Sequence, residues 1–327
     1  MQITLYEMAT TPLTDTQKSN LNIGYCCLNM NLRSLGIFTS RTCRLDTIKK
    51  LGIEYSYELA EANLKDLAAI LRWNYNNGIF LYRMSSEIFP FATHPEYSQN
   101  YDLDRFKGLL QKIGGCAKKW GIRLTFHPGQ HCVLASSSEK VVFSALCDID
   151  FHAKVMDFMC LDKDGVIVIH GGSKQDGKEA ALTRFAQNFS RLTESARERL
   201  VIENCEMMYS ITDLIPVSRD LGIPIVVDYH HHNINKGDIS DNASLQACTE
   251  KVLEIWGKRE ITPLFHLSES KPYVKESDSI TARRAHSDYV IRFPDVLLEL
   301  VETKRIDLDI EAKHKEKAVL YLKKNYY

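Results

Sequence analysis

The sequence lacks every pattern that would tie its cysteines to a disulfide framework or a zinc ribbon. The nine cysteines are an odd number, they are scattered, and no Cys-x-x-Cys pair occurs among them. We therefore expect free thiols, mostly buried, in a reducing compartment.

Long apolar runs and a secretory signal are also absent. Nowhere do 18 apolar residues run together, and the segment from Met1 to Asn22 has no basic region followed by an apolar stretch. These absences favour a soluble intracellular protein without a membrane partner. The formal net charge is -1, so global charge gives no support for nucleic-acid binding. A basic rim around an acidic metal site would average to the same value.

Eight short apolar runs recur along the chain, each followed at once by a polar and often ionisable residue. Most are rich in β-branched or aromatic residues, as expected of strands buried on both faces. They cover residues 23–27, 80–84, 123–126, 166–169, 200–202, 225–227, 263–265 and 306–310. Patterns with one apolar helical stripe lie between them, at 58–77, 103–120, 176–195, 241–257, 294–303 and 313–325.

This alternation of strands and helices predicts an α/β protein with a parallel sheet. Eight such units in 327 residues are typical of a single-domain, TIM-type (β/α)8 barrel. We expect the barrel over residues 23–327 and an N-terminal extension over residues 1–22. The alternative is an open doubly wound sheet, which is disfavoured because neither G-x-G-x-x-G nor a Walker pattern follows an early strand.

Side chains that bind metals follow the last six apolar runs. The carboxyl ends of barrel strands meet at one mouth, where TIM-barrel active sites lie. In chain order these residues are His127, His170, Glu203, Asp228, His266 and Glu311, with His231 and His286 in loops close behind. So many carboxylates and imidazoles would be costly to leave unpaired at one mouth, and a cluster of cations removes that cost.

The ligand types narrow the choice of metal. Mixed imidazole and carboxylate ligation suits Mn²⁺, Zn²⁺, Fe²⁺ or Mg²⁺, and the lack of a thiolate argues against a structural zinc. Glu203 lies in the middle of the array, where it could bridge two ions. Two ions roughly 3.5–4 Å apart activate water and stabilise a departing oxygen, as the slow hydrolysis of a phosphodiester requires.

At these residues the sequence resembles the UV damage endonuclease family, from Gly24 to the last helix. The most specific segments are His-Pro-Gly-Gln at 127–130 and Glu-Ala-Lys at 311–313, in this order. Further matches lie at 24–29, 82–86, 169–172, 202–204, 227–231, 265–268 and 285–289. The family is similar to the endonuclease IV barrels. The resemblance implies incision of double-stranded DNA on the 5′ side of UV photoproducts, with three divalent ions, Mn²⁺ foremost.

The resemblance also assigns roles to individual residues. The implied metal ligands are His127, His170, Glu203, Asp228, His231, His266, His286 and Glu311. Among them, Glu203, Asp228 and Glu311 are the expected catalytic carboxylates. Asp288 is either a further ligand or a carboxylate that orients a ligand histidine. Tyr25, Asn29, Gln130 and His131 are the expected lesion contacts. Without the resemblance, Tyr25 would be interpreted as a core aromatic residue whose hydroxyl is hydrogen-bonded.

The chain departs from the family pattern at two positions. Members usually carry a Tyr where this chain has His131, and a Lys where it has Leu264, two residues before the seventh-strand histidine. The first change adds a titratable ring, and the second removes a polar side chain near the metals. In the run His230-His231-His232 only His231 matches the family, and we interpret the other two as loop residues.

DNA contacts are expected from basic loops at the same mouth, in an enzyme that acts as a monomer. The residues are Lys174, Lys178, Lys271, Lys275, Arg283 and Arg284, with Tyr273 interleaved. The alternative for these loops is a solvated charged surface. Two other functions remain open from the residues alone. One is a metal-dependent sugar isomerase on the same barrel, and the other is a lesion-binding protein with impaired catalysis.

Overall fold

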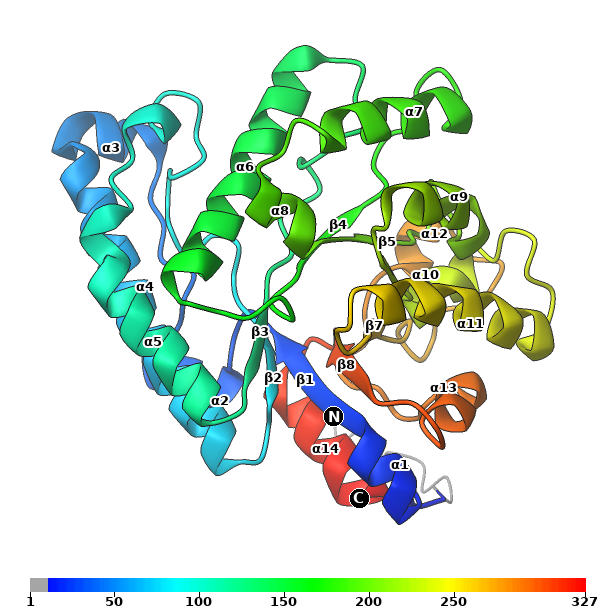
Figure 1. Ribbon diagram of the computed structural model, residues 1–327. Helices are drawn as coiled ribbons and strands as arrows, with labels where there is room; N and C mark the ends of the chain where they lie inside the picture. Colours follow the sequence, from blue (N-terminus) through cyan, green and yellow to red (C-terminus); the bar gives the residue numbers. More distant parts are fainter. Residues whose placement is uncertain (1–10) are drawn as a thin grey trace.

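The computed structural model describes residues 11–327, and eight parallel strands form the centre of the fold (Figure 1). The strands are β1 (Leu21–Cys26), β2 (Leu81–Arg83), β3 (Arg123–Thr125), β4 (Ile167–His170), β5 (Leu200–Glu203), β6 (Ile225–Val226), β7 (Leu264–Leu267) and β8 (Ile306–Ile310). Each expected apolar run contains one strand or overlaps one. The shifts of up to two residues at the ends are usual for sequence patterns.

Strand pairing closes these strands into a ring. Hydrogen bonds give two sheets, in the orders β3-β2-β1-β8-β7 and β4-β5-β6. Single parallel bridges, Phe126 to Ile167 and Asp228 to His266, join the sheets at both gaps. The ring therefore runs from β1 to β8 in chain order, and the predicted TIM-type barrel is confirmed.

Helices surround the ring, with one or more between successive strands (Figure 1). The longer ones are α4 (Ile53–Asn76), α5 (Lys107–Lys119), α6 (Glu139–Phe158), α7 (Lys178–Phe189), α9 (Ile211–Leu221), α11 (Asn242–Lys258) and α14 (Glu316–Tyr326). The shorter ones are α1 (Asp15–Asn20), α2 (Met30–Arg33), α3 (Leu45–Leu51), α8 (Glu194–Arg199), α10 (Tyr229–Ile234), α12 (Ile280–Arg283) and α13 (Asp295–Leu300). The 3₁₀ turns Ser98–Asn100 and Asp104–Phe106 precede α5.

Two helical expectations need correction. The single helix predicted over 176–195 is two helices, because the chain leaves helical geometry after Phe189 and Thr193 caps the start of α8 through the Ala196 N–H. The 20-residue α6 was not predicted at all. Buried residues lie on most turns of α6, including Asp148 and His152, so no narrow apolar stripe stands out in its sequence.

The described part of the N-terminal segment packs on the barrel. Helix α1 leads directly into β1, and the Leu13 N–H donates to the Tyr326 carbonyl over 2.8 Å, which ties this segment to α14 (Figure 1). Residues 1–10 of the predicted extension lie outside the described residues, and the division at residue 22 stays a prediction. Within residues 11–327, no helix combines the length and apolarity needed to cross a bilayer.

The two strands β1 and β2 pack closely at Gly24, because a Cβ at this position would lie 2.3 Å from the Leu81 carbonyl oxygen. All nine cysteines are free thiols, as expected, but only four of them are buried.

Candidate metal centre

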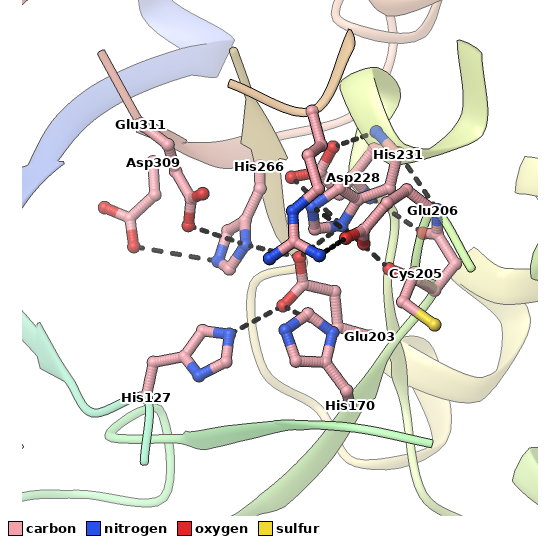
Figure 2. Close-up of polar contacts among 12 residues, drawn as sticks. His127, His170, Glu203, Cys205, Glu206, Asp228, His231, His266, Asp309 and Glu311 are labelled. Atoms are coloured by element: carbon pink, nitrogen blue, oxygen red, sulfur yellow. Dashed lines mark hydrogen bonds and ion pairs between the residues drawn. The ribbon is translucent and has the colours of Figure 1, made fainter. Parts of the chain in front are cut away.

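Six of the expected ligands converge on a seventh, Glu203, at the carboxyl ends of the strands (Figure 2). His170 and Glu203 are the last residues of β4 and β5, and His266 lies on β7. Glu311 directly follows β8, His127 and Asp228 lie two residues after the ends of β3 and β6, and His231 lies on α10. Asp228 also fixes the start of α10, since its carboxylate accepts the His231 N–H over 2.7 Å.

The Glu203 carboxylate is fully buried at the middle of the group. Its Oε2 lies 2.8 Å from His127 Nε2. Its Oε1 lies 3.2 Å from both His231 Nδ1 and His266 Nδ1. The two carboxylate oxygens therefore face different imidazoles, which is the geometry of a bridging ligand.

Three sets of ligand atoms lie close enough to hold an ion each. Within residues 11–327 they are His127, Glu203 and His266; His170, Glu203 and His231; and Asp228, His266 and Glu311. The ligand atoms of each set lie within 4.8 Å of one another. Glu203 and His266 each belong to two sets. The two Glu203 oxygens could serve two ions, whereas the His266 Nδ1 could bind only one.

Several buried polar atoms of the side chains around Glu203 lack a hydrogen-bond partner, which bears on whether these residues fit a metal. Glu203 Oε1, Asp228 Oδ2, His170 Nδ1 and His266 Nδ1 are buried and have no hydrogen-bond partner among the described residues. Buried polar atoms are normally paired, and leaving one unpaired costs about 1–3 kcal/mol. Divalent cations would satisfy these atoms together, so the residues present fit a metal centre.

The electrostatics of the centre depend on charge as well as burial. Burial alone would raise the pKa of the Glu203 carboxyl, but neighbouring imidazoles, His266 foremost, hold it well below its usual range. Burial lowers the pKa of His266, and the carboxylates of Glu203 and Glu311 outweigh burial and raise it to about 9. Burial lowers the pKa of His170 to about 4, which keeps this imidazole neutral, as a metal ligand must be.

Three residues without an assigned role also belong to this region. Arg83, on β2, donates to the Glu311 carboxylate. Glu206 lies 3.7 Å from His231 Nε2 and 3.1 Å from Arg284 Nη1. Asp309 is fully buried on β8, and burial raises its pKa to about 6. Alternation along a strand could have found Asp309, since it precedes Glu311 by two residues.

The family model described as UV-endonuclease UvdE matches residues 21–327. This chain belongs to the UV-endonuclease UvdE family. The predicted resemblance is thereby confirmed.

Individual relatives agree with this assignment. The UV-damage endonuclease of Schizosaccharomyces pombe is 40% identical over 311 residues, which are 93% of this chain and 50% of that protein. The UV DNA damage endonuclease of Bacillus pumilus is 33% identical over 277 residues, 84% of this chain and 83% of that protein. The chain thus spans about half the length of the fungal relative.

A solved structure supports the same assignment. The crystal structure of SacUVDE is similar with a TM-score of 0.77 and 32% identity, covering 93% of this chain and 98% of that one. The two alternative functions, a sugar isomerase and an impaired lesion-binding protein, are not favoured by these relatives.

Of the family's expected lesion contacts, one lines the cavity with the ligands, one lines a neighbouring cavity, and two are buried. Gln130 and His131 are exposed, and Gln130 lines a cavity of about 270 Å³ together with the ligands. Interaction with the Asp148 carboxylate, 3.6 Å away, raises the pKa of His131. Tyr25 and Asn29 are fully buried. The Asn29 amide donates to the Tyr25 hydroxyl, which donates to Asn74. Their lesion contact stays a prediction.

The remaining expected site residues lie around this centre. The His286 Nε2 is 3.9 Å from the Glu311 carboxylate, at the edge of the group. Asp288 is exposed and belongs to none of the three ligand sets. His230 and His232 are not loop residues, since both are buried in α10. Leu264 is buried on β7, beside Asp307 of β8.

Basic residues stand at the same end of the barrel. Arg284 lines the cavity, and Lys174 reaches the Met207 carbonyl nearby. Lys178 pairs with Asp213, Tyr273 is exposed, and Arg283 reaches the Asn233 carbonyl. A second cavity of about 290 Å³ adjoins the first, lined in part by Val133, Met207 and Met208.

Proposed function

We propose that this chain is a metal-dependent endonuclease that nicks double-stranded DNA on the 5′ side of UV photoproducts. The observation that carries this proposal is the set of unpartnered imidazole and carboxylate atoms around Glu203, in a chain of the UvdE family. The three overlapping ligand sets support more than one divalent ion in the centre, and we propose three per chain, with Mn²⁺ the first candidate.

Bound divalent ions would supply activated water and charge neutralisation for the departing oxygen of the phosphodiester. The chain's own residues hold the ligands in place for this. Glu203 presents its two oxygens to opposite sides of the site. Asp228 is oriented by its bond to the start of α10, and Glu311 by Arg83. This preorganisation spares the site a rearrangement during the reaction.

The open mouth suits a damaged duplex. Gln130 is exposed beside the ligands and His131 is exposed at a neighbouring cavity, where they can fill the space left by a base that has left the stack. Arg284 is held over the cavity by Glu206, in reach of a phosphate. Every proposed ligand comes from one barrel, so a single chain suffices for the site.

The test is incision of a duplex that carries one cyclobutane pyrimidine dimer, in Mn²⁺ and in a chelator. We expect nicking 5′ to the dimer by the wild type, none in the chelator, and a loss of at least about 100-fold in Glu203→Ala. The matched control is Glu299→Ala, which removes an exposed glutamate from α13. Equal activity in the two variants would refute the metal assignment, and an undamaged duplex cut equally well would refute the lesion specificity.

A further inference from the structure

Strand β8 carries a column of acidic side chains into the barrel. Asp307, Asp309 and Glu311 are two residues apart, so they share the face of the strand that carries Glu311 into the metal centre. All three are largely buried. A TIM barrel is usually filled here by branched apolar side chains, so this column needs a physical reason.

Two members of the column have an arginine as partner, and the middle one does not. The Arg123 Nη1 lies 2.7 Å from the Asp307 Oδ2 in a buried ion pair. At the other end, Arg83 donates to the Glu311 carboxylate. Both carboxylate oxygens of Asp309 are buried without a hydrogen-bond partner among residues 11–327.

The group that faces Asp309 is the imidazole of His266. The two residues are direct neighbours across β7 and β8. The His266 Nε2 lies 3.8 Å from the Asp309 Oδ2 (Figure 2), and neither atom has a hydrogen-bond partner. The other ring nitrogen, Nδ1, lies 3.2 Å from Glu203 and 3.4 Å from Glu311. The ring thus has one nitrogen toward the metal centre and one toward Asp309.

We propose that Asp309 is a positioning residue for His266, and the proposal rests on the metal centre proposed above. A cation at Nδ1 of a neutral imidazole leaves the single ring proton on Nε2, which faces Asp309. The carboxylate accepts that proton, fixes the tautomer and the ring orientation, and makes Nδ1 a better ligand. Asp309 contacts neither the ions nor the DNA in this role.

The competing explanation is that Asp309 only supports the fold by neutralising Arg83, whose Nε is also buried and unpartnered. The two explanations differ in what removal of the carboxylate does to the metal-free protein. If Asp309 orients a metal-bound histidine, a leucine in its place weakens metal binding and leaves the stability of the metal-free fold close to that of the wild type, because the carboxylate has no hydrogen-bond partner to lose there. If it supports the fold, the same leucine destabilises it.

The experiment compares Asp309→Leu and Asp309→Asn with the wild-type chain. Mn²⁺ affinity is measured by titration with electron paramagnetic resonance of the free ion, and fold stability by urea unfolding in a chelator. We expect Asp309→Leu to bind at least one ion about 10–100-fold more weakly, while its unfolding midpoint stays close to that of the wild type. Asp309→Asn keeps an oxygen acceptor, so its Mn²⁺ affinity should stay within a few-fold of wild type.

The matched control is Asp307→Leu, one layer further from the metals on the same strand. It breaks the buried pair with Arg123, so its unfolding midpoint falls while its Mn²⁺ affinity stays at the wild-type level. An Asp309→Leu protein that binds Mn²⁺ as tightly as wild type overturns the positioning role alone. The positioning role is likewise overturned if Asp309→Leu fails to fold or unfolds at a lower urea concentration than the wild type. A wild-type chain that binds no Mn²⁺ overturns the metal centre and the positioning role together.

Discussion

The metal-free protein should lose stability as the pH rises from about 6.5 to about 8.5. The cause is His266, whose pKa is raised to about 9 because the charges of Glu203 and Glu311 outweigh its burial. The unfolded imidazole titrates near 6.5. A folded pKa above the unfolded one stabilises the fold fully below about 6.5, and this stabilisation is lost as the pH rises through the folded value.

The magnitude follows from the size of the shift. One pKa unit corresponds to about 1.4 kcal/mol, so a histidine raised from 6.5 to about 9 contributes about 3 kcal/mol at low pH. About 2 kcal/mol of this is lost over the stated interval. His231 adds to the loss, since its pKa is also raised well above the usual range. His170, with a pKa of about 4, is neutral throughout the interval.

The assay is urea unfolding followed by circular dichroism, in a chelator, at several pH values. Glu203→Gln removes the carboxylate that contributes most to raising the His266 pKa, so its profile should be much flatter than that of the wild type. With saturating Mn²⁺ the stabilisation by metal should grow with pH, because the ligand imidazoles must be neutral. A flat wild-type profile in the chelator would refute the assigned charge distribution.

Three further outcomes test the packing and the mouth. Gly114→Ala should destabilise the fold by about 1–3 kcal/mol, because its Cβ would lie 1.8 Å from the Met159 carbonyl oxygen. At the neighbouring Gly115 a Cβ would have no atom within 4 Å, so Gly115→Ala should stabilise α5 by about 0.5–1 kcal/mol. Urea unfolding of the two variants measures this difference. Arg83→Met should lower the free energy of unfolding in the chelator by about 3 kcal/mol, because Glu311 loses its partner. Mn²⁺ should restore part of that loss. An unchanged stability in the chelator would contradict the pairing. His131→Ala should weaken dimer-specific incision while Mn²⁺ affinity is unchanged; a drop in metal affinity would contradict its place outside the ligand sets.

The repeating pattern of the chain was enough to predict the barrel. Each strand is buried on both faces and so appears as an apolar run, and each run ends in a polar residue at the mouth. Helix α6 escaped prediction because so much of its surface is buried. The break between α7 and α8 escaped because the apolar spacing continues across it, although Thr193 begins a new helix.

The ligand set was equally accessible from the sequence, because strand ends of a barrel meet wherever the chain places them. Alternation along β8 points to Asp309, but the partners of Asp309 and Arg83 could not be predicted, because they depend on which neighbouring strand faces each residue.

The sequence by itself therefore determined the order of most strands and helices and the candidate metal-binding side chains, since both follow from local periodicity and position. Only the tertiary structure decided which atoms meet. It placed Glu203 between imidazoles from several strands, left Asp309 facing His266 without a hydrogen-bond partner, and buried Tyr25 and Asn29. The physical reason is that pairing and burial are properties of contacts between distant segments, which no local pattern records.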